Sequence, residues 1–242
     1  MHACEGIDGR ARKELFDLDR LGLLDAYTVL VHGLAIDETG VALMRQRRAS
    51  LIMCPSSNQF LFRTLPKIAL LSTIENLCIG SDSPLTATGD LLDEIRFAIA
   101  YCNIDPDVAY RMLTEAPAAI LRLREGEGAI EASCPADLIA IRDTGHDAAD
   151  RLRTLSLADV EFVMIRGHVQ LASEAILERL PVPMQRGLEP LWIDGTTRWL
   201  RAPVNQLLQS AEAILGSGEV RLGGKPIRRV EWAEDEARYG AA

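Results

Sequence analysis

The chain has 242 residues, of which 48% are hydrophobic and 25% charged, and its formal net charge is -9. This composition is typical of a globular protein and excludes a disordered one. Arginines and lysines are scattered along an acidic chain, so we expect no binding to a nucleic-acid backbone. No stretch approaches the roughly 20 apolar residues that span a bilayer, so we expect no membrane partner.

The five cysteines stand at wide spacing, and no two form a Cys-x-x-Cys pair. An odd number without paired spacing is typical of buried, reduced thiols rather than of a disulfide framework. Residues 1–5 contain neither the basic region nor the apolar stretch of a secretion signal. The sequence therefore predicts a cytoplasmic protein.

The first hundred residues alternate between short apolar segments and helical patterns. Strands are expected at residues 1–2, 28–32, 51–54 and 77–80. Helices are expected at residues 8–21, 37–48, 65–72 and 89–101. This alternation predicts β-α crossovers and a parallel sheet that is buried on both faces.

Two further short helices are expected between residues 105 and 123, where Asp105-Pro106 and Ala116-Pro117 are start signals. The glycine-rich, charged stretch 124–128 that follows is typical of a domain boundary. We therefore divide the chain into one domain at 1–123 and another at 124–242.

The second domain has strand patterns at residues 136–141, 160–165 and 169–171, and a tight turn at 166–168 joins the last two. An amphipathic helix is expected at 204–215, and a further element at 228–232. These patterns predict a small antiparallel β module.

Residues that can bind a metal or move a proton stand at the ends of three of the expected strands. His2 and Glu5 follow the first strand, His32 ends the second, and Asp82 lies just beyond the fourth. The carboxyl ends of neighbouring parallel strands meet at one face of a barrel, so these four side chains should line one pocket.

Each residue also has a plain structural interpretation. His2 alone is compatible with a terminal residue without a role, Glu5 with a solvated acid, and Asp82 with a turn or helix cap. His32 is different, because a polar ring directly after an apolar buried strand needs a partner. The three strand ends together favour a catalytic site over separate structural roles.

A catalytic zinc or iron ion needs imidazole or carboxylate ligands and an open position for water. His2 and Asp82 are the candidate ligands. Glu5 is placed to take the proton of the water and return it to a departing nitrogen, and His32 to polarise the substrate or hold hydroxide in line.

Small polar residues after the third and fourth strands are candidates for substrate binding, namely Ser56, Asn58 and Ser83. For Ser56 and Asn58 the alternative is capping of the next helix.

The ordered motifs resemble the C-terminal half of a metal-dependent hydrolase of the amidohydrolase superfamily, in the branch of cytosine, guanine and adenosine-type deaminases and triazine chlorohydrolases. The matching segments are His2-x-x-Glu5 and residues 29–33, 54–58 and 80–84, together with 135–138 and 167–169. The resemblance implies an α/β fold, with strands 5 to 8 of a (β/α)8 TIM barrel at 1–123 and a partial β-sandwich at 124–242.

The resemblance also implies a site with one divalent metal, zinc or iron. His2 and Asp82 would be ligands, Glu5 the proton shuttle, Asp82 also a base, and His32 a neighbour of the hydroxide and the substrate. The family takes two further ligands from a His-x-His pair on its first strand, and this chain contains no such pair.

Two functional hypotheses remain open at this point. In the first, the chain is part of a deaminase-like hydrolase that acts on a carbon-nitrogen, non-peptide bond of a small cyclic amidine or amide. In the second, it is a non-catalytic half-barrel that is completed by an upstream half or by self-association with its own copy.

Overall fold

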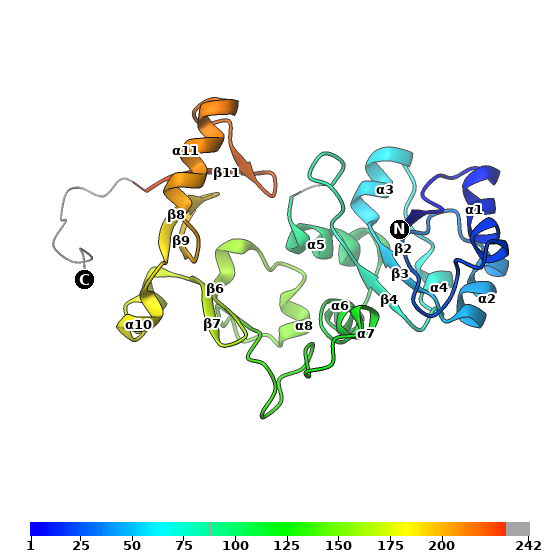
Figure 1. Cartoon of the computed structure of the whole chain (residues 1–242), viewed down its shortest axis with the longest axis horizontal. Helices are drawn as coiled ribbons and strands as arrows, with labels where there is room; N and C mark the ends of the chain where they lie inside the picture. The colour runs from blue at the N-terminus through cyan, green and yellow to red at the C-terminus, as the bar shows by residue number, and fades with distance from the viewer. Residues whose placement is uncertain (88, 231–242) are drawn as a thin grey trace. The chain divides into compact units, whose positions relative to one another are not determined.

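The structure is a computed structural model that describes residues 1–87 and 89–230 (Figure 1). Its contacts divide the chain into two compact units. The first unit comprises Met1–Pro135 and Asp143–Leu157, and the second comprises Ala136–Arg142 and Ala158–Ala242.

The first unit is built on a parallel sheet of four strands in the order β1-β2-β3-β4 (Figure 1). The strands are β1 (His2–Ala3), β2 (Val29–His32), β3 (Ser50–Met53) and β4 (Leu77–Ile79). Leu30, Leu51 and Met53 share one face of the sheet and have no exposed surface, whereas Val31 and Ile52 on the other face are only partly buried. The expectation of a sheet buried on both faces is therefore met fully on one face only. The four predicted strands and their parallel arrangement are confirmed.

Helices connect these strands and follow them. They are α1 (Gly9–Arg20), α2 (Glu38–Arg47), α3 (Pro55–Phe62), α4 (Ile68–Leu71), α5 (Leu91–Cys102), α6 (Pro106–Leu113), α7 (Glu115–Leu121) and α8 (Ala148–Arg151). Aspartates cap several of them, since Asp8 and Asp37 each accept a backbone N–H of the first turn and Asp90 forms a capping box.

Helix α3 differs from the sequence expectation. Sequence analysis predicts no helix at 55–58 and gives Ser56 and Asn58 as substrate contacts or caps of the next helix, but these residues are the first turn of α3, with Pro55 at its start. Proline has no N–H to leave unpaired at this position and its φ suits a helix, so Pro55 begins α3 rather than ending a segment. The helix expected at 65–72 is reduced to the four residues of α4.

The second unit contains an antiparallel sheet of seven strands in the order β10-β11-β8-β9-β7-β6-β5. The strands are β5 (Leu138–Ile141), β6 (Val160–Ile165), β7 (His168–Ala172), β8 (Glu189–Ile193), β9 (Thr196–Leu200), β10 (Arg221–Leu222) and β11 (Lys225–Arg229). The helices are α9 (Glu174–Leu177), α10 (Val182–Gln185) and α11 (Val204–Leu215), and a 3-10 turn at Leu157–Asp159 precedes β6.

The core of the second unit consists of buried apolar side chains from β7, β9 and the segments between them, namely Val169, Ala172, Leu177, Leu188 and Trp199. The predicted β5, β6, β7 and α11 are confirmed. The element expected at 228–232 is β11 up to Arg229, while residues 231 and 232 lie outside the described part of the chain.

The sequence analysis missed the hairpin of β8 and β9. Its turn is Asp194-Gly195, and both residues have a positive φ, 46° and 92°. An Asp-Gly pair in this conformation is a common two-residue hairpin turn, so the signal was present in the sequence.

Within the described residues, no helix combines the length and the apolar character that crossing a membrane requires.

Candidate functional site

Two imidazoles and a carboxylate lie together at the carboxyl ends of β1 and β2. One potential ligand atom each from His2, Glu5 and His32 lies within 4.8 Å of the others. His32 Nε2 is 3.0 Å from His2 Nδ1 and 3.6 Å from Glu5 Oε1. The register explains this proximity, because Ala3 pairs with His32 across the parallel strands and so brings both strand ends level.

The backbone at these strand ends is strained. Cys4, His32 and Asp82 have φ angles of 54°, 79° and 55°, which side chains with a Cβ rarely adopt. Each of these residues stands where a parallel strand ends or has just ended, so the chain turns sharply there. Strain of this kind persists only where surrounding contacts hold it, and it concentrates at functional sites.

His32 is completely buried, and its ring is held from both sides. Its Nδ1 lies 3.1 Å from Asn58 Oδ1. An amide oxygen only accepts hydrogen bonds, so Nδ1 carries the proton. The other ring nitrogen, Nε2, faces His2 and Glu5.

Asp82 is the one of the four predicted site residues that lies outside this group of potential ligand atoms, and hydroxyl donors hold its side chain. Its Oδ2 accepts hydrogen bonds from Ser57 Oγ at 2.5 Å and from Thr86 Oγ1 at 2.9 Å. Burial pushes the pKa of Asp82 upwards, but these hydrogen bonds and the nearby His32 ring outweigh it and hold the pKa below its usual value. Asp82 is therefore ionised at neutral pH.

The donor set fits zinc. Imidazole nitrogen and carboxylate oxygen are the ligand types that catalytic zinc takes, and His2 and Asp82 offer one of each.

The three residues expected to bind substrate have different surroundings. Ser56 is buried against Glu94, Asn58 contacts His32, and Ser83 accepts a hydrogen bond from the backbone N–H of Leu85. Within residues 1–87 and 89–230, Nδ2 of Asn58 is buried and has no hydrogen-bond partner.

Sequence analysis did not assign Ser57, Thr86 or Glu94 to the site. Ser57 and Thr86 carry no pattern of their own. Glu94 did leave a signal, because it lies on the same helical face as the apolar residues Leu91, Ile95 and Ala98. An acid on an apolar face is expected to have a specific buried partner.

The thiols near the site are not nucleophiles. Burial raises the pKa of Cys4 and of Cys78 to about 11. Burial, followed by the charges of Asp82 and Glu94, also raises the pKa of Cys54 far above its usual value. These thiols stay protonated at neutral pH, which agrees with the sequence prediction of buried, reduced thiols.

A cavity of about 340 Å³ adjoins the site, and His2, Glu5, Arg10 and Phe62 are among the residues that line it. It gives the His2 and Glu5 side chains access to a small molecule.

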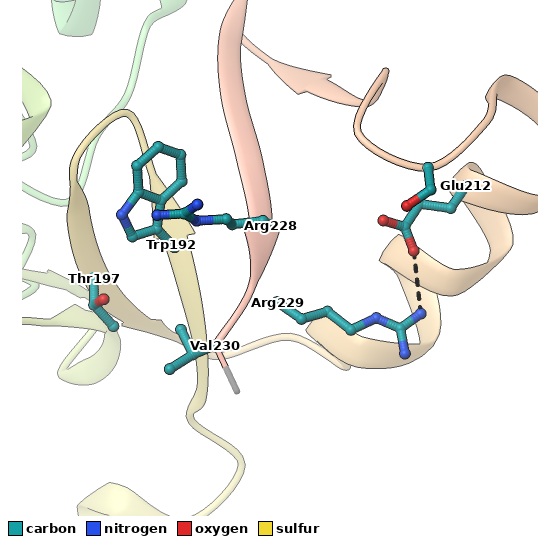
Figure 2. Close-up of a pocket in the computed structure, with 7 residues that line it drawn as sticks. Trp192, Thr197, Glu212, Arg228, Arg229 and Val230 are labelled. Carbon is teal, nitrogen blue, oxygen red and sulfur yellow. Dashed lines mark hydrogen bonds and ion pairs between the residues drawn. The ribbon is translucent and has the colours of Figure 1, made fainter. Parts of the chain in front are cut away.

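A separate cavity of about 600 Å³ lies in the second unit and contains none of the expected site residues (Figure 2). Its charged side chains are already engaged, since Arg228 stacks 4.0 Å from the ring centre of Trp192 and Arg229 pairs with Glu212 at 3.3 Å.

A sequence profile described as the amidohydrolase family matches residues 2–170. A 5′-deoxyadenosine deaminase from Methanoregula boonei is 34% identical over 135 residues, which are 51% of this chain and 30% of that protein.

Two solved structures share the fold. An adenosine deaminase from Xanthomonas campestris with bound zinc has a TM-score of 0.63 and 26% identity, and the match covers 71% of this chain and 44% of that one. An atrazine chlorohydrolase from Arthrobacter aurescens complexed with zinc has a TM-score of 0.59 and 19% identity, over 70% and 43% of the two chains. The chain thus spans less than half the length of these proteins.

Proposed function

Because the chain belongs to the amidohydrolase family, we propose that it forms the catalytic part of a metal-dependent deaminase that acts on a small cyclic amidine or amide. The observation that carries this proposal is the convergence of His2, Glu5 and His32 within 4.8 Å at the ends of adjacent parallel strands. Asp82, ionised and close to His32, supplies a further acidic group.

We propose that β1 to β4 correspond to strands 5 to 8 of a (β/α)8 barrel, with residues 1–123 as the barrel part and 124–242 as a partial β-sandwich. Four consecutive parallel strands in chain order, with polar residues at their carboxyl ends, support this assignment. An upstream half-barrel is the proposed partner, because two more histidine ligands would have to come from outside the sequence described here.

His2 and Asp82 are the proposed ligands of one divalent ion, zinc or iron. When bound, such an ion lowers the pKa of a coordinated water from about 16 towards about 7. Both side chains suit this role, because His2 supplies an imidazole nitrogen and Asp82 is kept ionised by its hydrogen bonds.

The remaining residues move protons and orient the water. The water oxygen forms a bond to the ring carbon that bears the amino group. Glu5 takes one water proton and passes it to the departing nitrogen, and Asp82 takes the second and passes it to the ring nitrogen. The carbon-nitrogen bond then breaks, ammonia leaves and the ring keeps the oxygen. His32 Nε2 hydrogen-bonds the water and keeps it in line.

We propose an aminated purine nucleoside as the substrate class, since a 5′-deoxyadenosine deaminase is among the relatives. The buried Nδ2 of Asn58, which lacks a partner in the described residues, supports a role in binding a substrate acceptor. Ser56 and Ser83 are the other proposed contacts.

We also propose a cytoplasmic location, which the five free cysteines support.

The test measures bound zinc and the ammonia released from 5′-deoxyadenosine by the protein purified in its native assembly. We expect zinc and ammonia release in the wild type, and a loss of both in Asp82→Ala. An Asp93→Ala variant, which removes an acid of α5 that pairs with Arg96, should keep both. A wild-type assembly without bound metal would refute the proposed chemistry.

A further inference from the structure

Glu94 is a buried carboxylate whose two oxygens serve a single residue. Its side chain on α5 is 1% exposed. Oε1 accepts the backbone N–H of Ser56 at 2.8 Å, and Oε2 accepts a short hydrogen bond from the Ser56 hydroxyl. No lysine or arginine pairs with Glu94 in the part of the chain that the structure describes. Burying an acid without a cation is costly, so this arrangement calls for a specific reason.

The carboxylate completes a helix that has no cap of its own. Cys54 occupies the N-cap position of α3 without a side-chain hydrogen bond to the helix, and Pro55 follows it. The first N–H groups of a helix have no partner inside the helix. Glu94 satisfies one of them from a position 38 residues further along the chain. A negative group at this end also interacts favourably with the helix dipole.

The first turn of α3 connects Glu94 to the site. Three consecutive side chains leave this turn in different directions. Ser56 donates to Glu94, Ser57 donates to Asp82 at 2.5 Å, and Asn58 accepts from His32 at 3.1 Å. All three residues of the turn are buried. A rotation or shift of this turn would therefore displace the partners of both Asp82 and His32.

We propose that Glu94 is a positioning residue, which anchors the first turn of α3 through Ser56 and thereby orients Asp82 and His32 together. The contribution of Glu94 to catalysis rests on the proposed deaminase function. The structural coupling of Glu94 to Asp82 and His32 does not depend on that function. Outer partners that orient ligand side chains typically contribute 10-fold to 100-fold in metal affinity or activity.

The test compares Glu94→Gln, Glu94→Met and the control Ile95→Val. Glutamine keeps an acceptor for the Ser56 N–H, whereas methionine has a similar length but removes both acceptors. Ile95 is the next residue on α5 and is buried, but its apolar side chain cannot hydrogen-bond Ser56, so its variant loosens α5 packing and spares the anchor.

The first readout is the imidazole ¹⁵N spectrum of the metal-free protein, which has only four histidines. In the wild type we expect the His32 signals of a ring that is protonated at Nδ1. Glu94→Met should move these signals away from those positions, and Glu94→Gln should move them less. Ile95→Val should lower the melting temperature and leave the His32 signals unchanged. Zinc affinity should fall about 10-fold or more in Glu94→Met, with partial recovery in Glu94→Gln.

Activity then separates the two proposals. If the wild type deaminates, kcat should fall about 10-fold or more in Glu94→Met while KM changes less. If His32 shifts but even the wild type lacks activity, the coupling stands and the deaminase proposal fails. An unchanged His32 spectrum and zinc affinity in a folded Glu94→Met protein would overturn the positioning role, whatever the activity. Should Glu94→Met fail to fold, an unchanged Glu94→Gln and Ser56→Ala pair would overturn it instead.

Discussion

The two units of the molecule use buried polar side chains in opposite ways. In the first unit, Ser57, Asn58 and their partners link one ionisable side chain to another near the strand ends. In the second unit, Arg198 is 4% exposed and donates to the backbone oxygens of Val160, Thr197 and Ala158 at 2.7 to 2.8 Å. A buried polar group that serves backbone oxygens stabilises a fold, whereas one that holds another titratable group prepares chemistry.

Positive φ angles also differ in what adjoins them. In the first unit, Cys4, His32 and Asp82 have positive φ angles next to the proposed chemistry, whereas those of Arg48, Arg63, Asn103 and Arg122 are at helix C-caps. In the second unit, Arg166 and Asp194 have positive φ angles at hairpin turns, where such geometry is ordinary. Similar dihedral angles therefore mean different things, depending on what the adjoining side chains contact.

Glu5→Gln should break the chemistry of the first unit without touching its fold. We expect turnover of the complete enzyme to fall by about 10²-fold to 10⁴-fold, because glutamine cannot carry the proton. Zinc content should stay unchanged, and so should the melting temperature, since the Glu5 side chain is 34% exposed. Ammonia release and metal analysis check this. Normal turnover would remove Glu5 from the mechanism.

Arg198→Met should destabilise the fold of the second unit. It removes hydrogen bonds to three backbone oxygens, one of them buried and two partly buried, so we expect a loss of about 3 kcal/mol in the free energy of unfolding. Urea unfolding followed by the fluorescence of Trp192 and Trp199 measures it. Arg142→Met is the control, because this 63% exposed side chain forms only a surface ion pair, worth less than about 1 kcal/mol. Equal losses in the two variants would contradict the comparison.

Gly33→Ala and Gly195→Ala compare a strand end with a hairpin turn. Both glycines have a positive φ, 64° and 92°. A Cβ at Gly33 would lie 2.7 Å from Leu51 Cδ1, whereas one at Gly195 would meet nothing within 4 Å. We expect a loss of about 2 kcal/mol or more for Gly33→Ala, and about 1 kcal/mol for Gly195→Ala. Denaturant unfolding distinguishes them, and a larger loss at Gly195 would contradict the packing argument.

Glu161→Gln should have the smallest effect on the free energy of unfolding, and this effect should depend on pH. Hydrogen bonding from the Ser173 hydroxyl lowers the pKa of Glu161, burial opposes this, and Arg142 lowers the pKa further. A carboxyl whose folded pKa is lowered stabilises the protein above its unfolded pKa and loses that contribution as pH falls through the folded value. The wild type should therefore exceed the variant by up to about 1 kcal/mol at pH 7, and the gap should shrink below pH 4.5. If the difference in stability between wild type and variant grew as the pH fell, the pKa of Glu161 would be raised rather than lowered in the folded protein, and the prediction would be wrong.

The sequence by itself determined the alternation of strands and helices in the first unit and the four residues at its strand ends. Both depend on local patterns, since a buried strand followed by a polar residue is legible within a few positions. His2, Glu5, His32 and Asp82 could be named for this reason, and the parallel sheet that brings His2, Glu5 and His32 together follows from the crossovers.

Only the tertiary structure decided what holds those residues in place. The contacts of Ser56 with Glu94, of Ser57 with Asp82 and of Asn58 with His32 join positions 25 to 38 residues apart. No local period encodes such pairs, because each depends on how α3 and α5 pack against the sheet. The same reason applies to β7, whose partner β9 lies two helices further along the chain.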